Sequence, residues 1–182
     1  MNGNRQIYPG GFLYRDTAVI LQTLKKKHRI KMEGLYMCSL YTIGYEGRQL
    51  DDFISLLDNN EIKVIIDVRE IAISRRSGFS KSKLSDALYV NGIEYVHFPS
   101  LGSPKNVRHQ LREDHDYSKF FTAYRLHASH VLDDIMKAMD IAERGHACLL
   151  CYEHDPSICH RSVLSGMMNS FSNIIEGVVN IL

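Results

Sequence analysis

Apolar and polar residues alternate along this chain in two periods, one typical of strands and one typical of helices. Apolar runs rich in aromatic and β-branched residues predict strands at residues 38–45 (CSLYTIGY), 62–69 (IKVIIDVR), 93–99 (IEYVHFP), 146–153 (HACLLCYE) and 177–182 (GVVNIL). The second run is apolar almost throughout, as expected for a strand that is covered on both faces. We therefore expect about five strands.

The segments between the predicted strands carry apolar residues at the spacing of a helix. Residues 50–60 predict one helix, and residues around 84–88 predict a short second one. After a polar loop, residues 117–144 predict one long helix or two adjoining helices, and residues 159–171 predict another. This alternation predicts an α/β fold, a single three-layer, Rossmann-like domain with a mainly parallel sheet of about five strands.

The first 36 residues do not continue this pattern. DTAVILQTLKKKHRIKM (16–32) has the spacing of an amphipathic helix, and the YPGG segment before it is typical of a loop. Its basic run favours a solvated helix face over a site for an acidic partner. Met32 and Met37 both precede the first strand, so we expect residues 1–36 to be a loosely attached N-terminal extension and residues 37–182 to be the α/β domain.

Composition excludes several classes of protein. The 182 residues are 45% hydrophobic and 24% charged with a net charge of +1, which is ordinary for a globular protein and supplies no global attraction for nucleic acid. No run of eighteen apolar residues predicts a membrane span, and the N-terminus does not resemble a signal peptide. We therefore expect a cytoplasmic protein with no membrane partner, in which cysteines are thiols or metal ligands.

Ligands of open α/β sheets bind where the carboxyl ends of the strands meet. The predicted strands deliver charged residues to that edge: Glu46 and Arg48 after the first, Asp67 and Arg69 at the end of the second. The loop at residues 69–83 adds four more basic residues, including Arg75, against one acid, and guanidinium groups suit phosphate. This pattern favours a phosphate-bearing ligand. Asp67 ends a buried apolar run and needs a partner, so it could equally belong to a structural ion pair or cap a neighbouring loop.

CYEHDPSICHRS, residues 151–162, allows three chemical interpretations besides a purely structural one. Cys151, Cys159 and His160 are residue types that bind zinc, but they lack paired C-x-x-C spacing, and two adjacent ligands rarely reach one ion. Cys159 near a helix N-terminus could instead be a nucleophile. Alternatively, the helix N-terminus and Arg161 could hold an anion, with Glu153 as a neighbour.

Several of these blocks resemble one family in order and spacing. YTIGYEGR (41–48), IDVREIAISRRSGFSKSKL (66–84), GIEYVHFPSLGSPK (92–105) and CYEHDPSICHRSVL (151–164) are similar to the signature blocks of the bacterial and archaeal domain-of-unknown-function family 488. The resemblance covers residue 40 to the C-terminus. It implies no settled activity, and the family pattern often has Pro where this chain has Ala72.

We interpret the chain as an enzyme acting on a phosphate-containing substrate, a nucleotide or nucleic acid. The residues expected to hold the phosphate are Arg48, Arg69, Arg75 and Arg161, with Glu46 beside them. The expected catalytic residues are Asp67, Glu153, His160 and Cys159. No cofactor is required by this interpretation. The alternatives are a binding module that catalyses nothing and a site dependent on zinc or another divalent metal at Cys151, Cys159 and His160.

Overall fold

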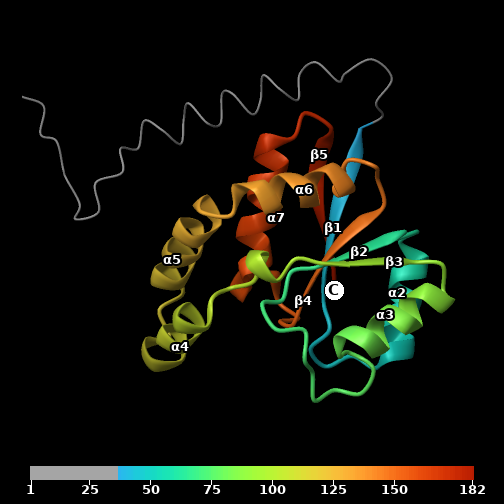
Figure 1. The fold of residues 1–182 in the computed structure, drawn as a ribbon, viewed down its shortest axis with the longest axis horizontal. Coiled ribbons are helices and arrows are strands. Elements are labelled where there is room, and N and C mark those ends of the chain that lie inside the picture. Colours follow the sequence, from blue (N-terminus) through green and yellow to red (C-terminus); the bar gives the residue numbers. More distant parts are fainter. Residues whose placement is uncertain (1–36) are drawn as a thin grey trace, which may run out of the picture.

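The structure is a computed structural model that describes residues 37–182 (Figure 1). Its strands are β1 (Cys38–Gly44), β2 (Val64–Asp67), β3 (Glu94–His97), β4 (Ala147–Cys151) and β5 (Ile175–Ile181). Its α-helices are α2 (Leu50–Asn59), α3 (Lys81–Val90), α4 (Lys105–Asp114), α5 (Tyr117–Ser129), α6 (Leu132–Ala142) and α7 (His160–Phe171). The expected N-terminal extension, residues 1–36, lies outside the described residues.

The five strands form one sheet in the order β3-β2-β4-β1-β5, and every neighbouring pair is parallel. The α/β fold predicted from the sequence is therefore confirmed, with a sheet that is entirely parallel. The register aligns Gly44 with Cys151 and Asp67 with His97. The carboxyl ends of β1, β2, β3 and β4 consequently lie along one edge of the sheet.

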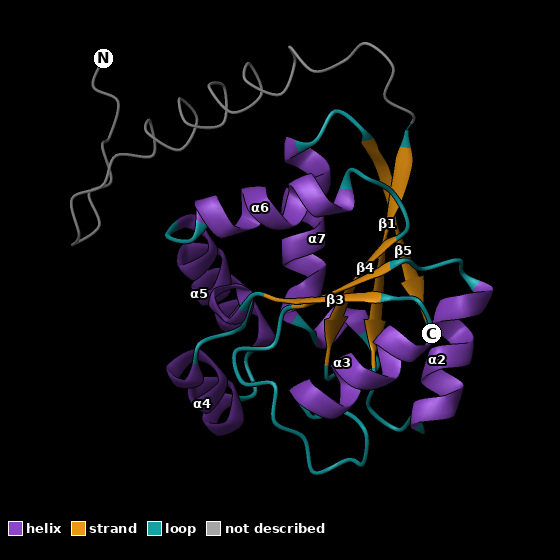
Figure 2. Cartoon of the chain, turned by 45° about the vertical axis from the view of Figure 1, so that its right-hand side comes forward, coloured by secondary structure: helices purple, strands orange, loops and turns teal. Residues whose placement is uncertain are grey.

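Helices cover both faces of the sheet, as Figure 2 shows. Alternate residues of β2 and β4 point to opposite faces, because side chains in a strand alternate in direction. Ile65 and Leu150 pack with α2 and α3, whereas Ile66 and Leu149 pack with α5, α6 and α7. These central strands are buried on both sides, which explains their nearly continuous apolar sequences.

The chain leaves β4 in a different direction from its two neighbours in the sheet. The connections after β1 and β2 lead to α2 and α3 on one face, whereas the connection after β4 leads to α7 on the other. Such a reversal is the topological switch point at which open parallel sheets leave room for a ligand. The fold therefore directs attention to the carboxyl end of β4.

The helical segment predicted at 117–144 is two adjoining helices, one of the two expected alternatives: α5 ends at Ser129, and α6 begins at Leu132 with Asp133 and Asp134 in its first turn. One local prediction needs correction. The predicted polar loop before this segment contains α4, which has no buried residue and packs beside α5 (Figure 1). α4 contains only two apolar residues, Val107 and Leu111, so its helical pattern is too sparse to stand out from a polar loop.

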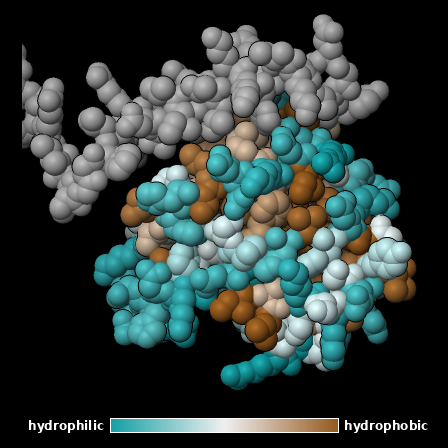
Figure 3. All heavy atoms as spheres, in the orientation of Figure 1, coloured by the Kyte–Doolittle hydropathy of each residue, from teal (hydrophilic) through white to brown (hydrophobic). Residues whose placement is uncertain are grey.

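The surface over α4, at the lower left of Figure 3, is correspondingly hydrophilic. None of the helices within residues 37–182 is both long and apolar enough to cross a bilayer.

Candidate functional site

Four side chains that can bind a metal converge at the carboxyl end of β4. They are Cys151, Glu153, Cys159 and His160, and their ligand atoms all lie within 4.8 Å of one another. The Sγ atoms of Cys151 and Cys159 each lie 3.0 Å from Oε2 of Glu153. His160 Nδ1 lies 3.7 Å from Cys151 Sγ and 3.9 Å from Cys159 Sγ. We call these four residues the Cys–Glu–His cluster.

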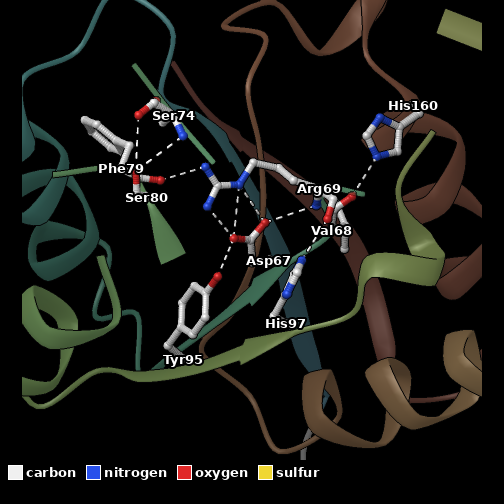
Figure 4. Close-up of polar contacts among 9 residues, drawn as sticks. All are labelled: Asp67, Val68, Arg69, Ser74, Phe79, Ser80, Tyr95, His97 and His160. Carbon is white, nitrogen blue, oxygen red and sulfur yellow. Dashed lines mark hydrogen bonds and ion pairs between the residues drawn. The ribbon is translucent and has the colours of Figure 1, made fainter. Parts of the chain in front are cut away.

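The opposite ring nitrogen of His160 is held by the backbone. His160 Nε2 lies 3.1 Å from the carbonyl oxygen of Val68 (Figure 4), and the imidazole packs beside the ring of Tyr124 at 4.9 Å between centroids. A carbonyl oxygen only accepts, so Nε2 carries the hydrogen in this contact, and the neutral ring then has a lone pair on Nδ1. Histidines that bind metals commonly have their second nitrogen fixed in this way.

The start of α7 explains how adjacent residues both enter the cluster. Residues 156–158 form a short 3-10 turn, which begins with the Asp155 carboxylate accepting a hydrogen bond from Ser157 N at 2.8 Å. Cys159 then has extended backbone angles as the N-cap of α7, whereas His160 is the first helical residue. The two adjacent residues therefore both reach the cluster, because they lie on either side of a helix boundary.

Burial and mutual contacts set the protonation of the cluster. Burial raises the pKa of both thiols, Cys151 and Cys159. Burial also opposes ionisation of Glu153, but hydrogen bonds from the two cysteines outweigh it and lower the pKa of this carboxyl below its ordinary value. For His160 burial lowers the pKa, and the neighbouring Cys159 and Glu153 together raise it above the ordinary value. In this state, protonated thiols donate to the Glu153 carboxylate.

Arg161 supports the loop behind the cluster. Its side chain is completely buried, and its guanidinium donates to the carbonyl oxygens of Glu153 at 2.5 Å and His154 at 2.9 Å. Its Nε also donates to Thr42 on β1 at 3.2 Å. Arg161 was expected to hold a phosphate, and in this structure its guanidinium holds the backbone that carries Glu153.

Asp67 and Arg69 form a buried ion pair at the end of β2 (Figure 4). The guanidinium donates Nη2 to Asp67 Oδ2 at 2.5 Å, donates Nη1 to the Phe79 carbonyl at 2.8 Å, and lies 5.1 Å from the centre of the Tyr45 ring. Tyr95 donates its hydroxyl to Asp67 as well, at 2.5 Å. Burial and the nearby carboxylate raise the pKa of Tyr95. This network fixes the backbone of β2 that receives His160.

Arg48 and Glu46, the two residues expected after β1, make hydrogen bonds within and between loops. Arg48 donates its Nε to the Gly44 carbonyl at 2.9 Å, and its Nη2 lies 3.4 Å from His154 Nδ1. Glu46 accepts the backbone N–H of His154 at 3.0 Å. These contacts join the loop after β1 to the loop after β4, and neither side chain borders the cavity described next.

A cavity of about 800 Å³ opens beside the cluster at the carboxyl edge of the sheet. Of the residues predicted from sequence, Arg69, Arg75, Cys151, Glu153 and His160 line it, whereas Asp67, Cys159, Arg48, Glu46 and Arg161 do not. The remaining wall residues come from the loops after β1, β2, β3 and β4 and from α4 and α5: Tyr45, Glu70, Ile71, Ile73, Ser74, Arg76, Ser103, Arg108, Leu111, Arg112, Tyr117, Phe120, Tyr152 and Ile158.

Sequence reasoning missed the contribution of α4 and of the loop before it. Arg108 and Arg112 of α4 and Ser103 line the cavity although that segment was interpreted as a polar loop. The signal that could have found the arginines is their separation of four residues, which places two side chains on the same face of a helix. Ser103 carries no comparable sequence signal.

A parallel sheet with this reversal and a cavity at its carboxyl edge places the protein among doubly wound α/β proteins. Residues 49–168 match the family described as "Domain of unknown function DUF488", and the chain belongs to this family. Comparisons with curated proteins and with solved structures found no match. The family resemblance expected from the motifs is therefore confirmed.

Proposed function

We propose that the protein is an enzyme that hydrolyses a phosphate-bearing substrate, a nucleotide or nucleic acid, at a centre holding zinc or another divalent ion. The observation that carries this proposal is the convergence of the Cys–Glu–His cluster within 4.8 Å beside a cavity lined by arginines. Thiolate and imidazole groups are typical zinc ligands.

In this proposal Cys151, Cys159 and His160 are the three protein ligands. Two cysteines and one histidine with an open fourth position are a known catalytic zinc arrangement. The Val68 carbonyl supports this assignment, since it holds the His160 ring with Nδ1 towards the sulfur atoms. The two thiols, which now point to Glu153, would have to release their protons to solvent in order to hold an ion, because thiolates rather than thiols bind metals.

Glu153 has the position of a proton acceptor. Its carboxylate contacts both sulfur atoms and lines the cavity, where a water molecule has access. A zinc ion held at such a site would lower the pKa of a coordinated water to about 7. Glu153 takes a proton from the attacking water as the water oxygen bonds to the electrophilic atom of the substrate. The bond to the leaving group then breaks, its electron pair stays with the leaving group, and protonated Glu153 returns the proton to that group.

Metal content tests the centre directly. We expect elemental analysis of the purified protein to find about one zinc ion per chain, and Cys159→Ser to remove it. Cys38→Ser is the matched control, because Cys38 lies at the start of β1 outside the cluster and should keep the ion. Cobalt substitution adds a readout independent of activity, a thiolate-to-cobalt absorption band that disappears in Cys159→Ser. Protein without bound metal after refolding with zinc would overturn the proposal.

Turnover separates an enzyme from a binding module. The zinc-loaded protein should hydrolyse at least one member of a panel of nucleotides, phosphate esters and short oligonucleotides. Glu153→Gln should keep the metal and lose roughly 100-fold or more in rate. Zinc-loaded protein that binds members of the panel and converts none would instead support the alternative, a module that binds a nucleotide or nucleic acid without catalysis.

A further inference from the structure

Ser103 is a buried hydroxyl without a partner. It follows β3, is 2% exposed and lines the cavity, and its Oγ has no hydrogen-bond partner among residues 37–182. Buried polar groups are normally paired because an unpaired one loses its hydration without compensation. A hydroxyl retained in this condition beside a cavity is typical of a group that bonds to a ligand.

The backbone around Ser103 is held firmly in place. Gly102 packs so closely on the loop after β2 that an added Cβ would lie 2.0 Å from Glu70 N. Arg108 of α4 donates to the Ser103 carbonyl and forms an ion pair with Glu70 at 2.5 Å. The loops after β2 and β3 and the α4 helix are thus clamped together, and the Ser103 hydroxyl stays beside the cavity.

Two arginines with uncommitted guanidinium groups line the same cavity. Arg75 comes from the loop after β2 and Arg112 from α4, and both are exposed. Within the described residues neither has an acidic partner; Arg112 uses only its Nε, which donates to the Arg108 carbonyl at 3.2 Å. The two acids that line the cavity, Glu70 and Glu153, are occupied by Arg108 and by the cluster thiols.

Aromatic side chains complete the lining. Tyr117 at the start of α5 is 38% exposed and Tyr152 after β4 is 46% exposed, and both border the cavity. Exposed tyrosine rings offer flat surfaces on which nucleobases stack. The cavity volume of about 800 Å³ lies within the range of pockets that hold molecules of nucleotide size.

We propose that Ser103, Arg75 and Arg112 form a phosphate subsite for a nucleotide whose base lies against Tyr117 or Tyr152. The Ser103 hydroxyl donates to a phosphate oxygen, and the two guanidinium groups, one from the loop after β2 and one from α4, neutralise the phosphate charge. The inference rests on the proposed function, since the phosphate would be delivered beside the cluster. In this proposal α4 forms part of the cavity wall and contributes to substrate specificity through Arg112.

The test measures binding by isothermal titration calorimetry to the full chain with each of the four ribonucleoside 5′-monophosphates, ribose 5-phosphate and inorganic phosphate. We expect at least one nucleotide to bind more tightly than both smaller phosphates. Arg112→Ala should weaken that binding roughly 10- to 100-fold, as expected for loss of a charged hydrogen bond. Arg125→Ala, an exposed arginine of α5 that does not line the cavity, is the matched control and should bind normally.

Ser103→Ala gives a second, independent readout. Removing an unpaired hydroxyl should leave the thermal midpoint of the free protein unchanged or raised, while nucleotide affinity falls. A lowered midpoint with unchanged affinity would show that the hydroxyl is structural and overturn the subsite. Unchanged affinity in Arg112→Ala, or no binding of any nucleotide by the wild type, would also overturn it.

Metal content keeps this inference separate from the proposed function. Arg112→Ala should retain wild-type zinc, so a loss of nucleotide affinity in that variant is assigned to the subsite. If the wild-type protein holds no zinc but binds a nucleotide through Arg112, the hydrolytic centre fails and the subsite stands. If zinc and turnover are present and Arg112→Ala binds normally, the subsite fails and the proposed function stands.

Discussion

His160 Nε2 lies 3.1 Å from the carbonyl oxygen of Val68, a residue 92 positions earlier in the chain. This contact connects the start of α7 to the end of β2 and leaves His160 Nδ1 beside the two cluster sulfurs. Because the acceptor is a backbone carbonyl, no substitution of Val68 removes it. The role of His160 must therefore be separated from its contribution to folding by replacing the ring itself.

We expect His160→Gln to lose most of the bound zinc while it remains folded. The longer amide can still donate to the Val68 carbonyl but has no nitrogen at the position of Nδ1. Elemental analysis and a thermal melt measure the two properties. The matched control is His97→Gln, since His97 Nε2 contacts the Arg69 carbonyl at 2.8 Å in the same part of β2 but lies outside the cluster. Equal zinc loss in both variants would contradict the ligand assignment.

Asp67→Asn should destabilise the protein by roughly 3–5 kcal/mol, because it leaves Arg69 buried without its ion-pair partner. Tyr95→Phe removes only the hydroxyl that donates to the same carboxylate at 2.5 Å, and should cost about 1.5–3 kcal/mol. Equilibrium unfolding in urea measures both. Costs that add fully in the double variant would argue against a single coupled network.

Gly44→Ala should disturb the candidate centre although Gly44 is not one of its four residues. A Cβ at Gly44 would lie 1.8 Å from the carbonyl oxygen of Glu153, so the backbone that carries this carboxylate must move. We expect a loss of about 1–3 kcal/mol or more in the free energy of unfolding, together with weaker zinc binding.

Gly166→Ala is the control for this substitution. Gly166 lies inside α7, and an added Cβ meets nothing within 4 Å there, so the change should stabilise the protein by roughly 0.5–1 kcal/mol. Denaturant unfolding and elemental analysis follow both variants. Normal zinc binding by Gly44→Ala would show that the loop after β4 accommodates the methyl group.

Asp134 should stabilise the protein in a manner that depends on pH. Hydrogen bonds from Lys137 and from Ser100 lower the pKa of this carboxyl, which lies in the first turn of α6. A lowered pKa in the folded state means that the stabilisation is present above the unfolded pKa and is lost as the pH falls through the folded one. Asp134→Asn should therefore cost roughly 0.3–1 kcal/mol at pH 7, with the difference vanishing in acid.

Asp133→Asn provides the comparison for that experiment. It removes a charge from the same helical turn but not the 2.5 Å hydrogen bond that Ser100 donates to Asp134. Urea unfolding at several pH values measures both variants against the wild type. A difference between Asp134→Asn and the wild type that persists unchanged at low pH would contradict the assignment.

The sequence pattern was sufficient to predict those elements whose side chains are buried. The apolar runs that became β2 and β4 can be recognised because both faces of these strands are covered, so nearly every side chain is hydrophobic. The helix α4 could not be recognised in the same way, because it buries no residue and has only two apolar residues, Val107 and Leu111, to mark a helical period. Its arginines were missed for that reason.

The sequence also predicted which charged residues lie at the carboxyl edge of the sheet, but it did not predict their hydrogen-bond partners. Arg161 and Arg48 were expected at a phosphate. In this structure Arg161 donates to carbonyl oxygens of the loop between β4 and α7, and Arg48 donates to the Gly44 carbonyl at the end of β1. A sequence does not show which buried carbonyls lack partners, since that depends on how loops from different strands pack. A structural ion pair at Asp67 was among the alternatives expected from sequence, and the structure adds that its partners are Arg69 and the Tyr95 hydroxyl.

By itself, the sequence determined the α/β class, the strand and helix order along most of the chain, the family and the edge at which reactive side chains gather. The tertiary structure alone decided that Cys159 and His160 both reach Cys151 and Glu153, and that Ser103 lines the cavity with its hydroxyl unpaired. The physical reason is that secondary structure follows from local periodicity, whereas a cluster depends on the backbone direction at a helix start and on contacts between residues far apart in the chain.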